Sequence, residues 1–262
     1  GQQLDTQMPV ASVPPEMADL AESLNAMLRR LQQDFRKLSE FSSDLAHELR
    51  TPISNLLTET QVAIAQPRSA DEYRDILASN AEEFQRLART VSDMLFLAKA
   101  EHGLVLPSRE QIAIEDEVAA LLEFYDALAE EKAIRLQQEG HGRMLGDRLM
   151  LRRALSNLLS NALRHAPTGG VVSISLQQDG NMTAVSICNP GPAIPAEQLP
   201  RLFDRFYRAD PARVAGESDG AGLGLAITRS IVEVHGGRIS VTSADDATCF
   251  TLWFPAQPPL AG

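Results

Sequence analysis

Apolar residues recur at spacings of four and three through two long segments, and this pattern limits the fold more than any other feature of the chain. Heptad spacing of this kind is typical of helices that pack along a shared seam. Between the segments, Pro67 ends one helix and Ser69 is suited to cap the next. The sequence therefore predicts a helical hairpin. Its seam positions are Leu24, Leu28, Leu31, Phe35, Leu38, Leu45, Leu49 and Leu56, then Tyr73, Leu77, Phe84, Leu87, Val91, Met94 and Ala98.

A single hairpin leaves part of these two seams uncovered. Two-fold pairing with a second copy is the simplest way to bury them, because an isologous interface gives a four-helix bundle. We therefore expect a homodimer that forms through the hairpin.

The pattern changes after His102, where residues 104–108 resemble a short linker and a second domain over 109–256 mixes helices with alternating strands. Asp147 is a candidate N-cap, and Gly180 with Asn181 is a hairpin-type turn signal. The fold class expected is multidomain, with an all-α hairpin followed by an α/β sandwich. The sequence predicts helices over 115–131, 147–165 and 222–235, and strands near 112 and over 133–138, 171–177, 183–189, 237–243 and 248–254.

The charge and the cysteine content exclude several classes of protein. A formal net charge of −11 argues against a general nucleic-acid binder. Cys188 and Cys249 lie far apart in the sequence, which predicts no disulfide framework and favours a reducing compartment. No apolar run is long enough to span a bilayer, and the chain starts without Met, so we expect a piece of a longer protein.

His47 is the first candidate for chemistry. With Leu45 and Leu49 in the seam, His47 falls at the outermost heptad position, and Thr51 lies one turn further on the same face. An exposed histidine is often only surface, but Pro52 removes a backbone donor here and predicts a local bend. A neutral imidazole suits phosphoryl acceptance, since a carboxylate such as Glu48 can orient its second nitrogen.

The string His-Glu-Leu-Arg-Thr-Pro, within residues 41–52, resembles the H box of sensor histidine kinases. The resemblance implies that His47 takes the γ-phosphoryl group of ATP and that Glu48 acts as the general base. It also implies that Thr51 helps to hydrolyse the phosphorylated partner, a response-regulator receiver domain that accepts the phosphoryl group on an Asp.

A polar stripe marks the helix expected over 147–165, where Asn157, Asn161, Arg164 and His165 share one face. The alternative is a merely solvated face, because Asn is a mediocre helix former. The stripe resembles the N box of the same kinases, whose ATP-binding domain is of the Bergerat type shared with gyrase and heat-shock chaperones. The resemblance implies that Asn161 ligates Mg²⁺ through its amide oxygen.

Three further segments resemble nucleotide-binding boxes of the family. The first contains Asn189 where the family has an Asp that accepts a hydrogen bond from adenine, and an amide oxygen can still accept it. A Rossmann dinucleotide site would need Gly at position 225, which is Leu, and a P-loop would need Gly-Lys-Ser/Thr, which is absent. Both kinds of nucleotide site are therefore excluded for this glycine-rich segment. The residues expected to bind ATP are Asn189, Gly191 and Ile194, then Phe203, Tyr207 and Arg208, and finally Gly220, Gly222, Leu223, Gly224 and Leu225.

The resemblance divides the chain further. Residues 1–30 resemble part of a HAMP signalling helix, residues 31–103 a dimerisation and phosphotransfer domain, and residues 257–262 form a tail. The motifs are closest to kinases that respond to copper, silver or cobalt–zinc–cadmium. They imply the cytoplasmic portion of a protein anchored in the bacterial inner membrane, with membrane contact and metal sensing in missing N-terminal and periplasmic segments.

Two other functions stay open at this stage. One is a non-catalytic dimeric signalling scaffold gated by ATP, which Asn189 favours. The other is a Bergerat ATPase or a serine kinase of the anti-sigma type. The intact His-Glu-Leu-Arg-Thr-Pro string disfavours both.

Overall fold

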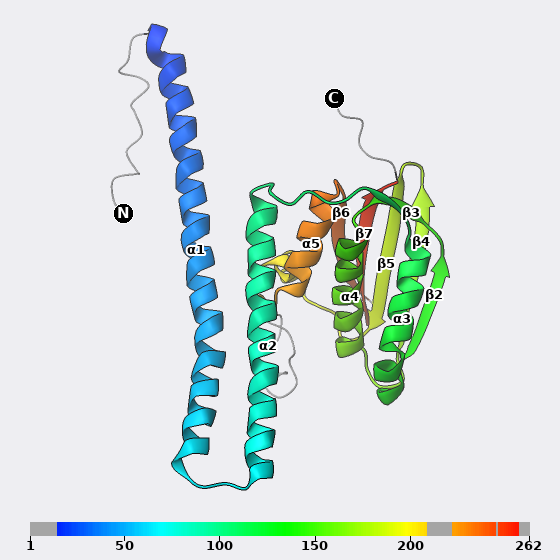
Figure 1. Cartoon of the computed structure of the whole chain (residues 1–262). Coiled ribbons are helices and arrows are strands. Elements are labelled where there is room, and N and C mark those ends of the chain that lie inside the picture. Colours follow the sequence, from blue (N-terminus) through cyan, green and yellow to red (C-terminus); the bar gives the residue numbers. More distant parts are fainter. Residues whose placement is uncertain (1–14, 209–221, 245, 257–262) are drawn as a thin grey trace. The chain divides into compact units, whose positions relative to one another are not determined.

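A computed structural model of the chain describes residues 15–208, 222–244 and 246–256 (Figure 1). The chain divides into two compact units, residues 1–87 and 88–262, which are treated separately below. Our narrower division, with a linker at residues 104–108, stays a prediction.

Two long helices form the hairpin (Figure 1). Helix α1 spans Pro15–Ala65 and contains Pro52, and α2 spans Ala70–Glu101. The expected cap at Ser69 is confirmed, since its Oγ accepts a hydrogen bond from the Glu72 amide at 3.2 Å and the Ser69 amide donates to Glu72 Oε2 at 2.8 Å. This reciprocal capping box satisfies amides that the first turn leaves free.

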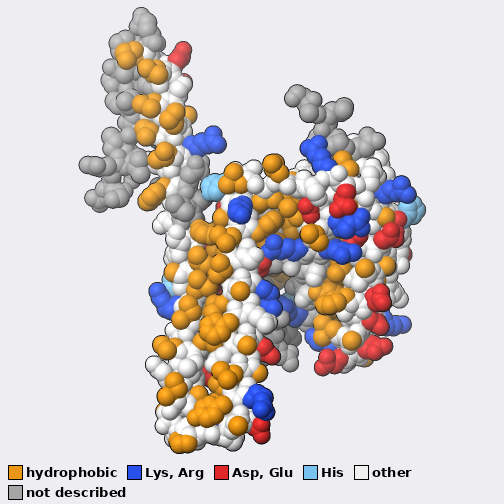
Figure 2. Space-filling view, in the orientation of Figure 1, with side chains coloured by type: hydrophobic (Ala, Val, Ile, Leu, Met, Phe, Trp, Pro, Cys, Tyr) orange, Lys and Arg blue, Asp and Glu red, His pale blue; other side chains and the backbone are white. Residues whose placement is uncertain are grey.

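Much of the apolar surface of the hairpin is exposed in the single chain. Leu56 and Ala63 are buried, but larger apolar side chains on both helices face solvent, and Figure 2 shows them gathered along the hairpin. Exposed apolar side chains gathered in this number normally mark an interaction site. Within residues 15–87 it comprises Met17, Leu20, Met27, Leu31, Phe35, Ile53, Leu57, Val62 and Ile64 on α1, and Tyr73, Leu77 and Phe84 on α2.

The second unit contains a five-stranded sheet in the order β2-β4-β5-β7-β6, in which only the β2–β4 pair is parallel. Helices α3, α4 and α5 lie on one face of the sheet (Figure 1). Side chains of β5 and β7 alternate between buried and half-buried, as expected for a sheet covered on one face. The bounds are β1 Glu110–Ala113, α3 Ile114–Glu131, β2 Arg135–Gly140, β3 Arg143–Gly146, α4 Arg148–His165, β4 Val171–Asp179, β5 Met182–Pro190, η2 Leu199–Phe203, α5 Gly224–Val234, β6 Arg238–Ala244 and β7 Ala247–Pro255.

The expected α/β sandwich is confirmed, and the expected elements agree with the structure to within a few residues. Asp147 is the N-cap of α4, with its Oδ1 accepting from the Met150 amide at 3.0 Å. Gly180, with a φ of +56°, and Asn181 form the two-residue turn between β4 and β5. Strand β3, which pairs with β1, and the short helix η2 were not expected.

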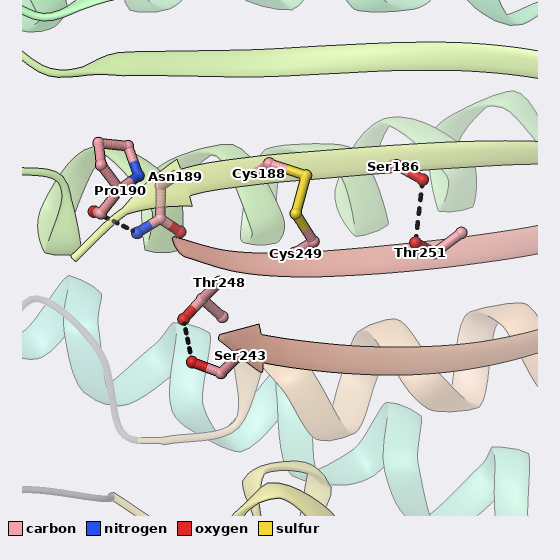
Figure 3. The surroundings of a disulfide bond; sticks show 8 residues. All are labelled: Ser186, Cys188, Asn189, Pro190, Ser243, Thr248, Cys249 and Thr251. Carbon is pink, nitrogen blue, oxygen red and sulfur yellow. Dashed lines mark hydrogen bonds between the residues drawn. A yellow bond between two sulfur atoms is a disulfide. The ribbon is translucent and has the colours of Figure 1, made fainter. Parts of the chain in front are cut away.

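The prediction that the cysteines are not bridged is wrong. Cys188 of β5 and Cys249 of β7 form a disulfide (Figure 3), with their Cα atoms 4.1 Å apart. The register of the two strands pairs these residues directly across the ladder. Their sequence separation of 61 residues gave no indication of this pairing.

Candidate functional site

The candidate phosphoacceptor face lies on α1. His47 and Thr51 are both exposed and stand one helical turn apart, as their heptad positions predict. Glu48 is half-buried beside them. The structure therefore leaves the His47 imidazole open to a second molecule or domain, which an acceptor of a phosphoryl group needs.

The polar stripe of α4 divides into two parts. Asn157 and Asn161 are half-buried, and Arg164 and His165 are exposed. The Asn157 Nδ2 donates to the Gly224 carbonyl at 3.0 Å and so ties α4 to the first turn of α5. Asn161 makes no hydrogen bond within the described part of the chain, so its amide oxygen is available to a ligand.

Asn189 ends the buried face of β5 and is only 4% exposed. Its Nδ2 donates to the Pro190 carbonyl at 3.0 Å, which leaves Oδ1 as an acceptor (Figure 3). The next residue, Gly191, donates its amide to the Asp246 carbonyl at 2.7 Å. A Cβ at Gly191 would lie 3.3 Å from the His165 carbonyl oxygen, so the loop after β5 passes close to the end of α4 and favours glycine there.

A chain of hydroxyl groups holds the same loop. The Ile194 amide donates to Ser243 Oγ at 2.9 Å, and Ser243 Oγ lies 2.8 Å from Thr248 Oγ1 (Figure 3). Thr248 is 5% exposed and pairs with Asn189 across the ladder. Sequence reasoning missed Ser243 and Thr248. The sequence could have indicated Thr248, because side chains two residues apart on a strand share a face and Phe250 lies on the buried face.

Residues 201–208 pack through the aromatic rings of Phe203 and Tyr207. Phe203 meets Phe250 edge to face with centroids 6.3 Å apart, and the Arg201 guanidinium lies 4.5 Å from the centroid of Tyr207. Phe203 and Tyr207 are half-buried and engaged with other side chains, whereas Arg208 is exposed.

The glycine-rich segment that begins at Gly222 contacts the aromatic segment at Phe206. The Phe206 amide donates to the Gly222 carbonyl at 3.1 Å, and Gly222 has a φ of +70°. A Cβ there would approach the Phe206 backbone to 2.9 Å, so this position requires glycine. Leu223 is buried, and Gly224 and Leu225 at the start of α5 are half-buried. Gly220 lies outside the described residues.

These contacts bring together three of the predicted groups, namely the stripe of α4, the loop after β5 and the start of α5. The last of these presents backbone N–H groups and a positive dipole end suited to an anion. Among the described residues, no group of three or more His, Cys, Asp or Glu is placed to hold a metal ion. The same residues include no helix that is long and apolar enough to cross a membrane.

The chain thus combines a helical hairpin that carries an exposed histidine with a domain in which a polar-striped helix covers a mixed sheet. Residues 37–103 match the His Kinase A (phospho-acceptor) domain, and residues 146–258 match the histidine kinase-, DNA gyrase B- and HSP90-like ATPase domain. The chain belongs to the sensor histidine kinases.

The curated relatives are sensor kinases and sensor proteins. The chain is 46% identical over 254 residues to sensor histidine kinase CusS of Escherichia coli K12, covering 97% of this chain and 53% of the relative. It is 40% identical over 243 residues to sensor protein CzcS of Cupriavidus metallidurans, covering 92% of this chain and 51% of the relative. The chain thus spans about half the length of the curated relatives it matches.

Solved structures agree with this assignment. Histidine kinase AdeS of Acinetobacter baumannii superposes with a TM-score of 0.67 at 23% identity, covering 80% of this chain and 98% of that one, which supports the fold. The mycobacterial sensor histidine kinase MprB is 30% identical with a TM-score of 0.50, covering 58% of this chain and 99% of that one.

Proposed function

We propose that the chain is an ATP-dependent protein-histidine kinase that phosphorylates His47 and passes the phosphoryl group to an Asp of a response-regulator receiver domain. The observation that carries this proposal is the exposed side chain of His47, which lies within the matched phosphoacceptor domain. The same chain also contains the matched ATPase domain. A related kinase, ThkA, has been solved in complex with response regulator TrrA, which supports the choice of partner.

The residues around the nucleotide site fit ATP and Mg²⁺. Asn189 offers a buried acceptor for the adenine amino group, because its Nδ2 is already committed to Pro190. Asn161 would hold Mg²⁺ through its amide oxygen, and Arg164 and Arg208 add positive charge toward the phosphates. Bound ATP supplies the phosphoryl group. The remaining predicted contacts come from Asn157, His165, Gly191, Ile194, Phe203, Tyr207, Gly220, Gly222, Leu223, Gly224 and Leu225.

On the hairpin, one imidazole nitrogen of His47 attacks the γ-phosphorus of ATP, the bond from that phosphorus to the bridging oxygen breaks to release ADP, and the other nitrogen carries a proton. Glu48 orients the ring and accepts that proton as positive charge develops. Thr51 is exposed one turn away on the same face, and we assign to its hydroxyl the positioning of a water for hydrolysis of the phosphorylated receiver. These roles need the acceptor face to stay in solvent, which its heptad position ensures.

The hairpin pairs with a second copy through its exposed apolar side chains. Burying such a surface in an isologous four-helix bundle stabilises the dimer and leaves the outward heptad position of His47 free. We further propose that the chain is the cytoplasmic part of an inner-membrane metal-response kinase, since its motifs resemble those of such kinases and its sensor-kinase relatives are about twice as long.

The test is incubation with γ-labelled ATP and Mg²⁺, followed by treatment of the labelled protein with acid and alkali. We expect a label that is lost in acid and kept in alkali, absent from His47→Gln and from Asn161→Ala. His141→Gln is the matched control, because His141 is equally exposed but lies outside the hairpin. A wild-type chain that binds ATP without becoming labelled would refute kinase activity and favour an ATP-gated scaffold.

A further inference from the structure

The disulfide lies on the face of the sheet opposite the helices. Cys188 and Cys249 are half-buried, whereas their neighbours Asn189 and Thr248 point to the buried face. Because both residues are partly exposed, we expect small thiols and disulfides to reach the bond from solvent. The bond is thus in reach of redox chemistry, although the residues next to it face the nucleotide side of the sheet.

The two sulfur atoms stay close whether or not they are bonded. The Cα separation of 4.1 Å is that of a non-hydrogen-bonded antiparallel pair, in which side chains approach most closely. The bond forms between two interior strands of the sheet, β5 and β7, which β4 and β6 flank on either side. Closing and opening the bond therefore needs no rearrangement of the strands.

The same strand ends hold the candidate adenine loop. One residue beyond Cys188 is Asn189, and one residue before Cys249 is Thr248, whose hydroxyl reaches the Ile194 amide through Ser243 (Figure 3). A covalent link between β5 and β7 at this point limits how far the strand ends can separate. It consequently restrains the distance between Asn189 and the hydroxyl chain that anchors the loop.

We propose that Cys188 and Cys249 form a reversible thiol–disulfide site that tunes nucleotide affinity through the β5–β7 strand ends. In reduction, the thiolate of a small thiol attacks one sulfur and releases the other cysteine as a thiolate, and a second thiol then resolves the mixed disulfide. Two small thiols thereby become one small disulfide, and the protein gains two electrons and two protons. Oxidation by a small disulfide reverses each step. The disulfide form pre-orders the loop and binds nucleotide more tightly.

The test compares the chain after equilibration with oxidised or reduced glutathione, with thiol alkylation and intact mass reporting the redox state. We expect the disulfide form to bind ATP–Mg²⁺ at least about fivefold more tightly by calorimetry, the lower end of coupling between linked sites. The double variant Cys188→Ser and Cys249→Ser is expected to show the affinity of the reduced form in both buffers. Ser186→Ala is the matched control, because it breaks the neighbouring cross-strand contact to Thr251 without touching the thiols.

Three outcomes would overturn the inference. Thiols that remain free in oxidised glutathione would refute the reversible site, and equal affinities in two verified redox states would leave the bond with a structural role alone. The coupling to nucleotide rests on the proposed function. A chain that binds no ATP in either state would refute both, whereas equal but measurable binding refutes only this inference.

Discussion

Replacement of Asp147 tests how the start of α4 is joined to the segment around Ser108 that precedes β1. The Asp147 carboxylate accepts three hydrogen bonds, one from the Met150 amide at 3.0 Å and two from Ser108, whose amide and hydroxyl lie at 3.2 and 2.9 Å. Its own amide donates to His235 Nε2 at 3.0 Å, and this bond survives any side-chain change. The carboxylate thus joins the start of α4 to the segment that precedes β1.

Asp147→Ala removes all three side-chain bonds. Loss of an N-cap costs about 1 kcal/mol. The two bonds to Ser108 are exposed and contribute roughly another 1 kcal/mol together. We therefore expect the free energy of unfolding to fall by about 2 kcal/mol. Asp147→Asn keeps an oxygen for the Met150 amide but replaces Oδ2, the acceptor of both Ser108 bonds, so it is expected to lose about half as much.

Urea unfolding followed by tryptophan fluorescence is the assay, because Trp253 on β7 is the single tryptophan of the chain. Ser108→Ala supplies a double-mutant cycle with Asp147→Ala, and the two changes should be less than additive. Equal losses for the Ala and Asn variants, or additive effects with Ser108→Ala, would refute the account of these contacts.

The pH dependence of the difference in unfolding free energy between the wild type and Asp147→Asn gives an independent check. Burial raises the pKa of Asp147, but the hydrogen bonds from Met150 and Ser108 outweigh it and hold the pKa below the ordinary value of 3.8. A carboxyl group with a depressed pKa in the folded state contributes stability above its unfolded pKa and loses it as the pH falls through the folded value. The gap between the wild type and Asp147→Asn should therefore be constant at neutral pH and shrink below about pH 4.

Two further predictions concern the same domain. Breaking the Cys188–Cys249 bond opens a loop with a sequence separation of 61 residues, so reduction should lower the free energy of unfolding by about 4 kcal/mol in the chain-entropy model. Urea curves with and without a reductant measure this, and a Cys188→Ser chain that still responds to the reductant would contradict it. Gly222→Ala should cost about 1–2 kcal/mol for the positive φ, with a further loss from the clash with Phe206. The control is Gly169→Ala, which shares the positive φ but has open space around its Cβ, and equal losses in the two variants would refute the packing argument.

Local features of the fold could be predicted because their causes lie within a few residues. The cap at Ser69 and the turn at Gly180 follow from side chains that bond or bend their own neighbourhood. Strand β3 could not be found in this way, because Arg143–Gly146 is too short for a clear alternation and becomes a strand only by pairing with β1. Burial of Glu117 was equally hidden, since its ion pairs with Arg148 and Arg152 of α4 join residues about thirty positions apart.

The arrangement of the candidate site was even harder to predict from the sequence, because it depends on contacts between residues far apart in the chain. The residue types of the boxes were visible in the sequence, but the contacts that position them join distant segments, and those around Asn189 depend on strand register. Register places Thr248 opposite Asn189 and Cys249 opposite Cys188, and a shift of one residue would exchange the two faces of β7. The disulfide follows from the β5–β7 pairing, whereas the hydroxyl chain to Ile194 also needs the β6–β7 pairing that sets Ser243 opposite Thr248. Both meet on β7, at the neighbouring residues Cys249 and Thr248, so a bond between the cysteines restrains the strand end that anchors the loop without rearranging the strands.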